Sequence, residues 1–214
     1  MNEPRQFTPV DVLLGEISKA INVLAAPARS ARPYPALAAP ADALERVERI
    51  ETARLMRVNH SGEVAAQALY HGQAVLARQP AVAAALQRSA IEEMDHLAWC
   101  EQRLKELGGR PSVLAPFWYA GSWLIGLLAG SAGDGASLGF ITETERQVES
   151  HLHEHLRRLP AADQRSRQIL NAMAADEVAH AAKAEELGGE PLPEPIRRAM
   201  KWTARIMTRC SFWL

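Results

Sequence analysis

Two groups of residues that could bind metal ions recur at matching spacing in the two halves of this chain. Each group contains a Glu-x-x-His pair and a single glutamate about 30 residues before it. Because positions i and i+3 lie on one face of a helix, each pair directs a carboxylate and an imidazole toward the same point. The first group is Glu63, Glu93 and His96, and the second is Glu145, Glu177 and His180.

Four carboxylates and two imidazoles form the ligand set of a di-iron or di-manganese carboxylate site inside a four-helix bundle. Oxygen and imidazole ligands suit iron and manganese better than a soft metal. A single Glu-x-x-His pair is weak evidence, because glutamate and histidine are common on solvated helix faces. Two copies are stronger evidence, since about 30 residues of helix-turn-helix return the chain to the same height. The pattern therefore predicts two duplicated helical hairpins around a metal site.

A second repeat supports this duplication. The sequence Glu-Leu-Gly-Gly occurs at 106–109 and again at 186–189, and each copy is soon followed by a proline. Two glycines and then a proline are typical of a helix end. The first copy lies about one helical turn further from its histidine, so we expect the first of these helices to continue a turn longer.

Composition favours an all-α protein. Of the 214 residues, 48% are hydrophobic and 23% are charged, which is sufficient for one domain over residues 1–214 with a full core. Abundant alanine and few aromatic residues favour helix over sheet. The formal net charge of −1 gives no sign of nucleic-acid binding.

Two cysteines are too few for a disulfide framework and fit a reduced cytosolic setting, with Cys100 a small core residue. The N-terminus lacks the pattern of a signal peptide, so a cytoplasmic location is expected.

Helical periodicity and turn residues divide the chain into segments. A Thr-Pro start followed by apolar residues at helical spacing predicts a short amphipathic helix at 8–26. Four prolines predict an extended linker at 27–42. A ferritin-like four-helix bundle is predicted over 43–187, with its one long crossover between the second and third bundle helices. These helices are expected at 43–78, 81–107, 134–158 and 161–187.

The crossover at 111–133 contains no charged residue. Its apolar length raises the prospect of a transmembrane span. A single span would place Glu93 and Glu145 on opposite sides of the membrane, so the metal site excludes it. A buried crossover and an interfacial or re-entrant segment remain, and the second is favoured. The aromatic residues then expected at headgroup depth are Trp118, Tyr119 and Trp123.

A basic amphipathic helix is predicted at 193–214. No acidic residue follows Glu194, and apolar residues recur at three- and four-residue spacing. Its basic residues are Arg197, Arg198, Lys201, Arg205 and Arg209. Such helices bind anionic membrane surfaces, although a core or partner interface gives the same stripe. Together the two segments predict membrane contact through residues 111–133 and 196–214.

Four specific motifs contain the candidate ligands. They are Arg57-Val58-Asn59-His60-Ser61-Gly62-Glu63, the pair Glu93-x-x-His96, the run 139–152 (Gly-Phe-Ile-Thr-Glu-Thr-Glu-Arg-Gln-Val-Glu-Ser-His-Leu) and Asp176-Glu177-x-x-His180. Together they resemble the demethoxyubiquinone hydroxylase family of ubiquinone biosynthesis, in its bacterial form. The resemblance runs from about residue 8 to the end of the chain.

The resemblance implies a di-iron monooxygenase, peripheral to the membrane, with two iron ions per subunit. Its substrate is expected to be a prenylated methoxy-methyl benzoquinol (demethoxyubiquinol) that receives a ring hydroxyl from O2. The six residues named at the outset match the family's iron ligands, and Glu93 and Glu177 are expected to bridge the irons. The cytoplasmic face of the cell membrane is the expected location. A homo-oligomer and a lipid-presenting partner remain open.

One departure from the family concerns His151 and Leu152, where eukaryotic members have a His-Tyr pair, so no role of that tyrosine is carried over. His151 lies six residues after Glu145, which is 600° of helix rotation, so it is not expected to bind the metal. Proton or electron delivery by His151 is a hypothesis. His153 and His155 are expected to be solvated.

Five further residues near the ligands have two interpretations each. His60 and His71 are either core residues or neighbours of the ligands. Glu92, Asp95 and Asp176 either accept the second ring proton of a ligand histidine or are solvated.

Three other functions remain open from the residues alone. An iron-storage or ferroxidase protein uses the same bundle, but it needs neither an uncharged crossover nor a basic tail. A manganese catalase and a non-catalytic membrane-associated interaction protein are the others. Fold alone does not choose among them, whereas the specific motifs favour the hydroxylase.

Overall fold

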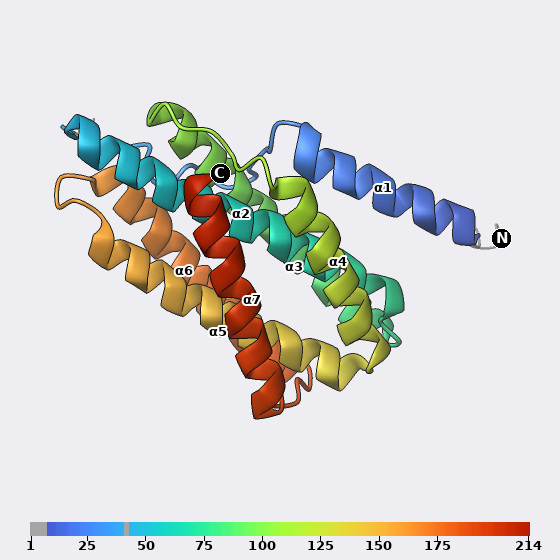
Figure 1. Cartoon of the computed structure of the whole chain (residues 1–214). Coiled ribbons are helices and arrows are strands. Elements are labelled where there is room, and N and C mark those ends of the chain that lie inside the picture. The colour runs from blue at the N-terminus through green and yellow to red at the C-terminus, as the bar shows by residue number, and fades with distance from the viewer. Residues whose placement is uncertain (1–7, 41–42) are drawn as a thin grey trace.

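Helices form all of the regular secondary structure in the part of the chain described by this computed structural model, residues 8–40 and 43–214 (Figure 1). The helices are α1 (Pro9–Ala25), α2 (Arg46–Leu76), α3 (Pro80–Glu106), α4 (Ala115–Ser131), α5 (Asp134–Arg158), α6 (Gln164–Glu186) and α7 (Glu194–Trp213). The prediction of an all-α protein is confirmed.

The bundle consists of two helical hairpins, α2 with α3 and α5 with α6. Contacts between α3 and α6 and between α2 and α5 join the hairpins into four helices around a common interior. The one long connection runs from α3 to α5, as in the predicted ferritin-like topology. Helix α7 crosses α2 and α5, while α1 projects from the bundle toward the N-terminus (Figure 1).

Local capping residues set the helix boundaries. Thr8 and Asp11 form a capping box at the start of α1, as the Thr-Pro start predicted. Helix α6 begins at Gln164 rather than at 161, because the side chain of Asp163 accepts a hydrogen bond from the amide of Ser166 and caps the helix there. Helix α3 continues a turn further past its histidine than α6 does, as predicted.

Apolar side chains pack above and below the middle of the bundle. The largest cluster joins α2, α3, α5 and α6 and includes Leu55, Trp99, Leu152 and Met173. A second cluster near the other end includes Tyr70 and Leu138, and a third lies between α2, α3 and α4. Cys100 is fully buried in the first cluster, as predicted. These layers shield the polar residues between them from water.

The apolar crossover forms a helix, α4, which the sequence did not predict. Gly72 of α2 and Gly126 of α4 meet where the two helices cross, and a Cβ at either position would overlap the backbone of the other helix. Tyr119 is buried with its hydroxyl 3.0 Å from Nδ1 of His71, so its predicted place at headgroup depth is wrong. Phe117 and Leu128 point outward on the opposite face. No helix of the described residues is long and apolar enough to cross a membrane.

The C-terminal helix α7 is fastened to the bundle at both ends. Near its start, Nε of Arg197 donates to the buried carboxylate of Glu143, 3.1 Å away. At its end, the amide of Val113 donates to the carbonyl of Leu214 at 3.1 Å, and the guanidinium of Arg54 lies 4.3 Å from the Trp213 ring centroid. The remaining basic residues of α7 are exposed. These are Arg198, Lys201, Arg205 and Arg209.

Candidate metal centre

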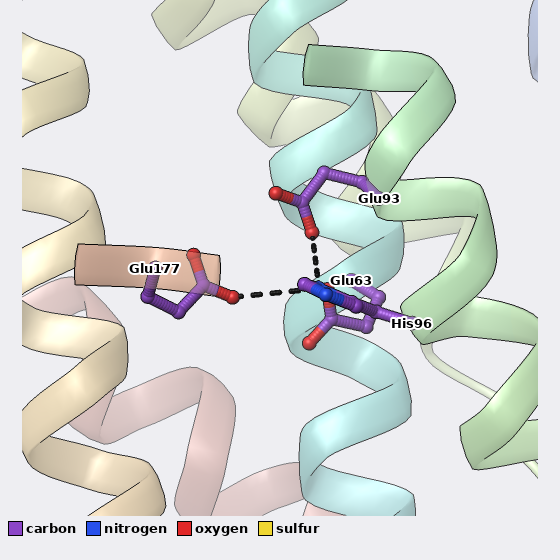
Figure 2. A group of neighbouring side chains, drawn as sticks. All are labelled: Glu63, Glu93, His96 and Glu177. Carbon is purple, nitrogen blue, oxygen red and sulfur yellow. Dashed lines mark hydrogen bonds and ion pairs between the residues drawn. The ribbon is translucent and has the colours of Figure 1, made fainter. Parts of the chain in front are cut away.

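The structure brings together all six residues that the sequence singled out. Two groups of four lie in the bundle interior, and within each group one ligand atom per residue lies within 4.8 Å of the others. The first group, shown in Figure 2, is Glu63, Glu93, His96 and Glu177. The second is Glu93, Glu145, Glu177 and His180. Because Glu93 and Glu177 belong to both groups, the arrangement can hold two cations side by side.

Each bundle helix contributes to the site. Glu63 comes from α2 and Glu145 from α5, while α3 and α6 each provide a Glu-x-x-His pair. The four glutamates are at most 3% exposed, and of the two histidines only the ring of His180 reaches the edge of the site, at 9%. A charged cluster at this depth requires compensation, because burial of unpaired charges is unfavourable.

The inner nitrogen of each histidine faces the shared carboxylates. Nδ1 of His96 lies 2.9 Å from Glu93 Oε2, 3.5 Å from Glu177 Oε1 and 3.7 Å from Glu63 Oε2. Nδ1 of His180 lies 3.0 Å from Glu93 Oε1 and 3.8 Å from Glu177 Oε2. Glu93 and Glu177 each face both imidazoles, one through each oxygen, and Glu93 makes the shorter approach to both.

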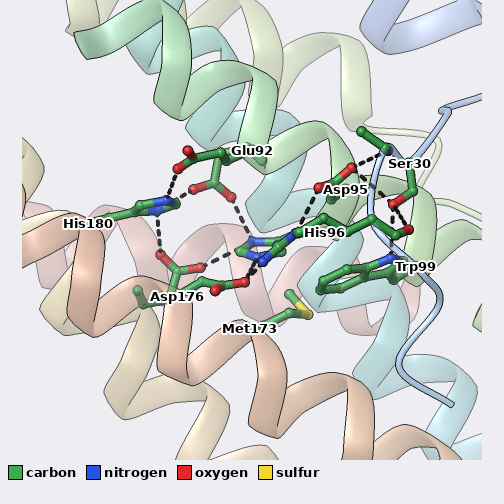
Figure 3. Close-up of polar contacts among 12 residues, drawn as sticks. Ser30, Glu92, Asp95, His96, Trp99, Met173, Asp176 and His180 are labelled. Carbon is green, nitrogen blue, oxygen red and sulfur yellow. Dashed lines mark hydrogen bonds and ion pairs between the residues drawn. The ribbon is translucent and has the colours of Figure 1, made fainter.

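The outer nitrogen of each histidine has a carboxylate partner (Figure 3). Nε2 of His96 lies 2.8 Å from Asp176 Oδ2, and Nε2 of His180 lies 2.8 Å from Glu92 Oε2. With Nε2 as donor, Nδ1 keeps the lone pair that binds a metal. Of the three acids that the sequence left open, Glu92 and Asp176 thus orient the rings. Asp95 does not, because its carboxylate accepts hydrogen bonds from the 27–42 linker.

Several buried atoms of the site lack a hydrogen-bond partner. These atoms are Glu93 Oε1, Glu177 Oε2 and His180 Nδ1. Glu93 Oε1 and His180 Nδ1 are only 3.0 Å apart, yet their orientation does not form a hydrogen bond. Buried polar atoms are normally paired, and lone pairs that converge on one volume are satisfied together by a cation. The oxygen and nitrogen donor set fits iron or manganese.

The charges of the cluster shift the pKa values of its members. Burial, reinforced by the neighbouring carboxylates, raises the pKa of Glu63 and Glu145 well above the ordinary value. Burial acts in the same direction on Glu93, but the His96 and His180 imidazoles outweigh it and lower its pKa. Burial alone would lower the pKa of His180, whereas the adjacent carboxylates raise it to about 12. A bound cation would favour the deprotonated forms of these groups, so metal binding at this site would be coupled to proton release.

Tyr70 is a functional candidate that the sequence analysis missed. Its buried hydroxyl donates a hydrogen bond to Oε1 of Glu145. Tyr70 lies seven residues after Glu63 on α2, which is two helical turns and therefore the same face. That spacing is the signal that could have identified it.

The other histidines occupy different surroundings from those expected. His155 is 1% exposed, so the prediction that it is solvated is wrong, whereas His153 is exposed as predicted. His155 lies three residues after the buried Leu152 and shares its inward face. Nδ1 of His155 is 2.8 Å from Asn59 Oδ1, and burial lowers the pKa of His155 to about 2. The His151 ring is tilted against that of His155, with ring centroids 4.0 Å apart, and His151 belongs to neither metal-type group.

The last two histidines left open by the sequence lie outside the cluster. His60 is buried, with Nε2 3.7 Å from Glu101 Oε1. His71 faces the hydroxyl of Tyr119, and burial lowers the pKa of His71 to about 4. Both are therefore packing residues of α2 rather than partners of the ligands.

Fold and site together define a ferritin-like helical bundle with a paired carboxylate–histidine site able to bind metal. The chain belongs to the family of the ubiquinone biosynthesis protein COQ7, whose profile matches residues 50–211. The matched region contains all six candidate ligands, α3 to α6 in full and most of α2 and α7.

Relatives match nearly the whole chain. The 3-demethoxyubiquinol 3-hydroxylase of Bordetella pertussis is 56% identical over 211 residues, which cover 98% of this chain and 95% of the relative. The protein of the same name from Nitrosomonas europaea is 51% identical over 205 residues, which cover 96% and 99%. That of Cupriavidus taiwanensis is 52% identical over 205 residues, which cover 95% and 99%.

Proposed function

We propose that this chain is a 3-demethoxyubiquinol 3-hydroxylase, a monooxygenase that uses O2 to add a hydroxyl group to the ring of a prenylated methoxy-methyl benzoquinol. The observation that carries the proposal is the buried six-residue cluster, in a chain more than half identical to hydroxylases of this name over almost its full length. An iron-storage protein is not favoured, because the relatives described above are all named as hydroxylases.

The cluster is proposed to hold two iron ions. Glu63 and His96 would serve one ion, Glu145 and His180 the other, and Glu93 and Glu177 would bridge them. The bridging assignment is supported by the membership of both glutamates in both groups of four. When bound, a pair of ferrous ions supplies the electrons and the Lewis acidity that the activation of O2 requires.

The chain's own residues prepare the site for this chemistry. Asp176 and Glu92 keep the outer nitrogens protonated, so that Nδ1 of each ligand histidine faces inward as an acceptor. The Tyr70 hydroxyl holds the carboxylate of Glu145 in place. Apolar clusters on either side of the site exclude water from it. A site that is dry and preorganised strengthens each electrostatic interaction within it.

Membrane contact is proposed for the exposed apolar face of α4 and the basic face of α7, residues 111–133 and 196–214. Phe117, Leu124 and Leu128 of α4 are at least 55% exposed, and Trp202 and Trp213 of α7 are at least 63% exposed. Helix α1, which is hydrogen-bonded to α4 through Glu16 and Trp123, adds a further exposed apolar stripe. Apolar side chains beside basic residues suit an anionic lipid surface, where a prenylated quinol resides. The proposed location is the cytoplasmic face of the cell membrane.

Quinone profiling of a cell that lacks this protein tests the function. We expect demethoxyubiquinone to accumulate and the intact gene to restore ubiquinone. A Glu177→Ala copy should fail to do so, whereas Glu186→Ala should succeed, because Glu186 is an exposed glutamate of the same helix. Normal ubiquinone in the absence of this protein, with no second hydroxylase present, would contradict the proposal.

A further inference from the structure

The linker before the bundle passes over the outside of the site (Figure 3). The hydroxyl of Ser30 and the amide of Ala31 donate to Oδ1 of Asp95, at 2.9 and 2.6 Å. Nε of Arg32 donates to the other oxygen of the same carboxylate, at 2.8 Å. Asp95 is 4% exposed and lies one residue before His96 on α3. The linker is therefore anchored to α3 beside a ligand histidine.

Arg32 also binds a second carboxylate, that of Asp176. Its Nη2 donates to Asp176 Oδ2 at 2.7 Å, and that same oxygen lies 2.8 Å from Nε2 of His96. The guanidinium also stacks on Trp99, 4.6 Å from the ring centroid, and Trp99 itself donates to the Ser30 hydroxyl. Arginine presents a rigid planar set of donors, so one side chain can fix both acids at once.

The other histidine has no such support. Nε2 of His180 lies 2.8 Å from Glu92, whose side chain is 55% exposed, compared with 27% for Asp176. Among the residues that the structure describes, Glu92 has no basic partner besides His180. The outer partner of His96 is therefore held by a cation and a linker, whereas that of His180 extends into solvent.

We propose that Arg32 is a positioning residue, which fixes Asp176 and through it His96, and that the metal position at His96 is consequently held more firmly than the one at His180. The inference rests on the proposed metal centre. Removal of the hydrogen-bond partner of a ligand's outer nitrogen typically lowers metal affinity by about 10- to 100-fold. An arginine that holds one such partner and not the other makes the two positions unequal.

Release of metal to a chelator tests the inference without any measurement of activity. The full-length protein is loaded with Co(II), and loss of the metal to excess chelator is followed by its absorption spectrum. We expect two phases of one ion each in the wild type, and His96→Ala should remove the slow one. Arg32→Gln should accelerate the slow phase by about tenfold or more and leave the fast phase unchanged. Glu92→Gln should accelerate only the fast phase.

Two matched variants separate positioning from stability. Arg158→Gln removes an arginine whose side chain is as exposed as that of Arg32, 41% in both cases. Arg158 pairs with Glu51 rather than with the linker or the site, so this variant should leave both phases unchanged. Asp95→Asn keeps Arg32 and Asp176 but weakens the anchor, and it should accelerate the slow phase. Arg32→Lys retains the charge without the planar fork, so its slow phase should lie between those of the wild type and Arg32→Gln.

The outcomes distinguish this inference from the proposed function. If the wild type binds fewer than two ions, the metal centre itself is contradicted and the inference fails with it. If two ions bind but leave in a single phase, or if Arg32→Gln changes both phases equally or neither, only the role of Arg32 is overturned.

Discussion

The imidazole rings of His96 and His180 lie 6.3 Å apart, centroid to centroid, although they come from different halves of the chain. Their inner nitrogens face the two oxygens of one carboxylate, that of Glu93, from opposite sides. The duplicated hairpins thus meet at a carboxylate that belongs to both groups of four candidate ligands. Loss of a shared ligand should affect both metal positions, and loss of a histidine only one.

Metal stoichiometry should report this arrangement directly. We expect two iron ions per chain in the wild type, one in His96→Ala and one in His180→Ala, and none held tightly in Glu93→Ala, because Glu93 belongs to both groups. Elemental analysis after anaerobic loading with Fe(II) and gel filtration gives the count. His153→Ala, which removes an exposed histidine of α5, serves as the control and should retain two ions. Two ions in Glu93→Ala would refute the shared role.

The hydroxyl of Tyr70 should contribute far more to the free energy of unfolding than a tyrosine hydroxyl at the surface. In Tyr70→Phe the buried Oε1 of Glu145 loses its donor, and an unsatisfied buried acceptor costs about 1–3 kcal/mol of unfolding free energy. Urea denaturation of the metal-free protein measures the loss. In Tyr34→Phe the lost hydrogen bond, 3.3 Å long, lies at the surface, so the loss should be about 0.5 kcal/mol or less. Equal losses in the two variants would show that the hydrogen bond to Glu145 stabilises the protein no more than one at the surface.

Much of the fold and the whole cluster of candidate ligands could be predicted from local spacing. The i, i+3 pairs and the Gly-Gly helix ends depend on helix geometry alone, which is the same in any bundle. The spacing from Glu63 to Glu93 then fixes the height at which two antiparallel helices bring their ligands together. Each of these features is a short-range property of the chain, so the sequence contains it explicitly.

The sequence did not reveal the contacts of Arg32 and Tyr119, because these join segments that are distant along the chain. Arg32 and Asp176 lie 144 residues apart in the sequence, and no periodicity relates the linker to α6. The burial of Tyr119 depends on the glycine contact between α2 and α4, which brings its hydroxyl against His71. His155 was misjudged because a run of histidines and charges resembles a solvated face, although the three-residue step from Leu152 places it inside.

His155 should make stability depend on pH. The folded protein protonates His155 only near pH 2, whereas the unfolded chain does so near the ordinary pKa of about 6.5. Between these values unfolding takes up a proton, so the contribution of His155 to stability is present above about pH 6.5 and is lost as the pH falls. From pH 7 to 5.5 the loss should be about 1 kcal/mol.

The variant His155→Gln isolates this contribution, because glutamine can donate to Asn59 but does not titrate between pH 5 and 7. Urea denaturation of the metal-free variant should show a shallower decline with falling pH than the wild type, by about 1 kcal/mol. Groups that do not contact His155 should titrate equally in both proteins, including His71, whose pKa is lowered to about 4. Parallel pH profiles would rule out a neutral buried His155 as a source of acid sensitivity.

The basic face of α7 should control binding to anionic membranes. Lys201 and Arg205 are exposed, and each basic residue near an anionic surface contributes about 1 kcal/mol. The double variant Lys201→Gln/Arg205→Gln should therefore bind phosphatidylserine-containing vesicles about 30-fold more weakly in a sedimentation assay. Both side chains lie outside the apolar clusters, so the helix should stay folded, which circular dichroism can verify.

Two comparisons make this test specific for α7. The variant Arg88→Gln/Arg157→Gln removes the same number of exposed charges from α3 and α5, and it should bind the vesicles as the wild type does. Residual binding of the α7 variant should persist at high salt, because salt does not screen the apolar contact of the exposed Phe117 and Leu128 side chains of α4 with lipid. If both double variants lose affinity equally, attraction depends on net charge rather than on the face of α7, and the proposed orientation at the membrane is wrong.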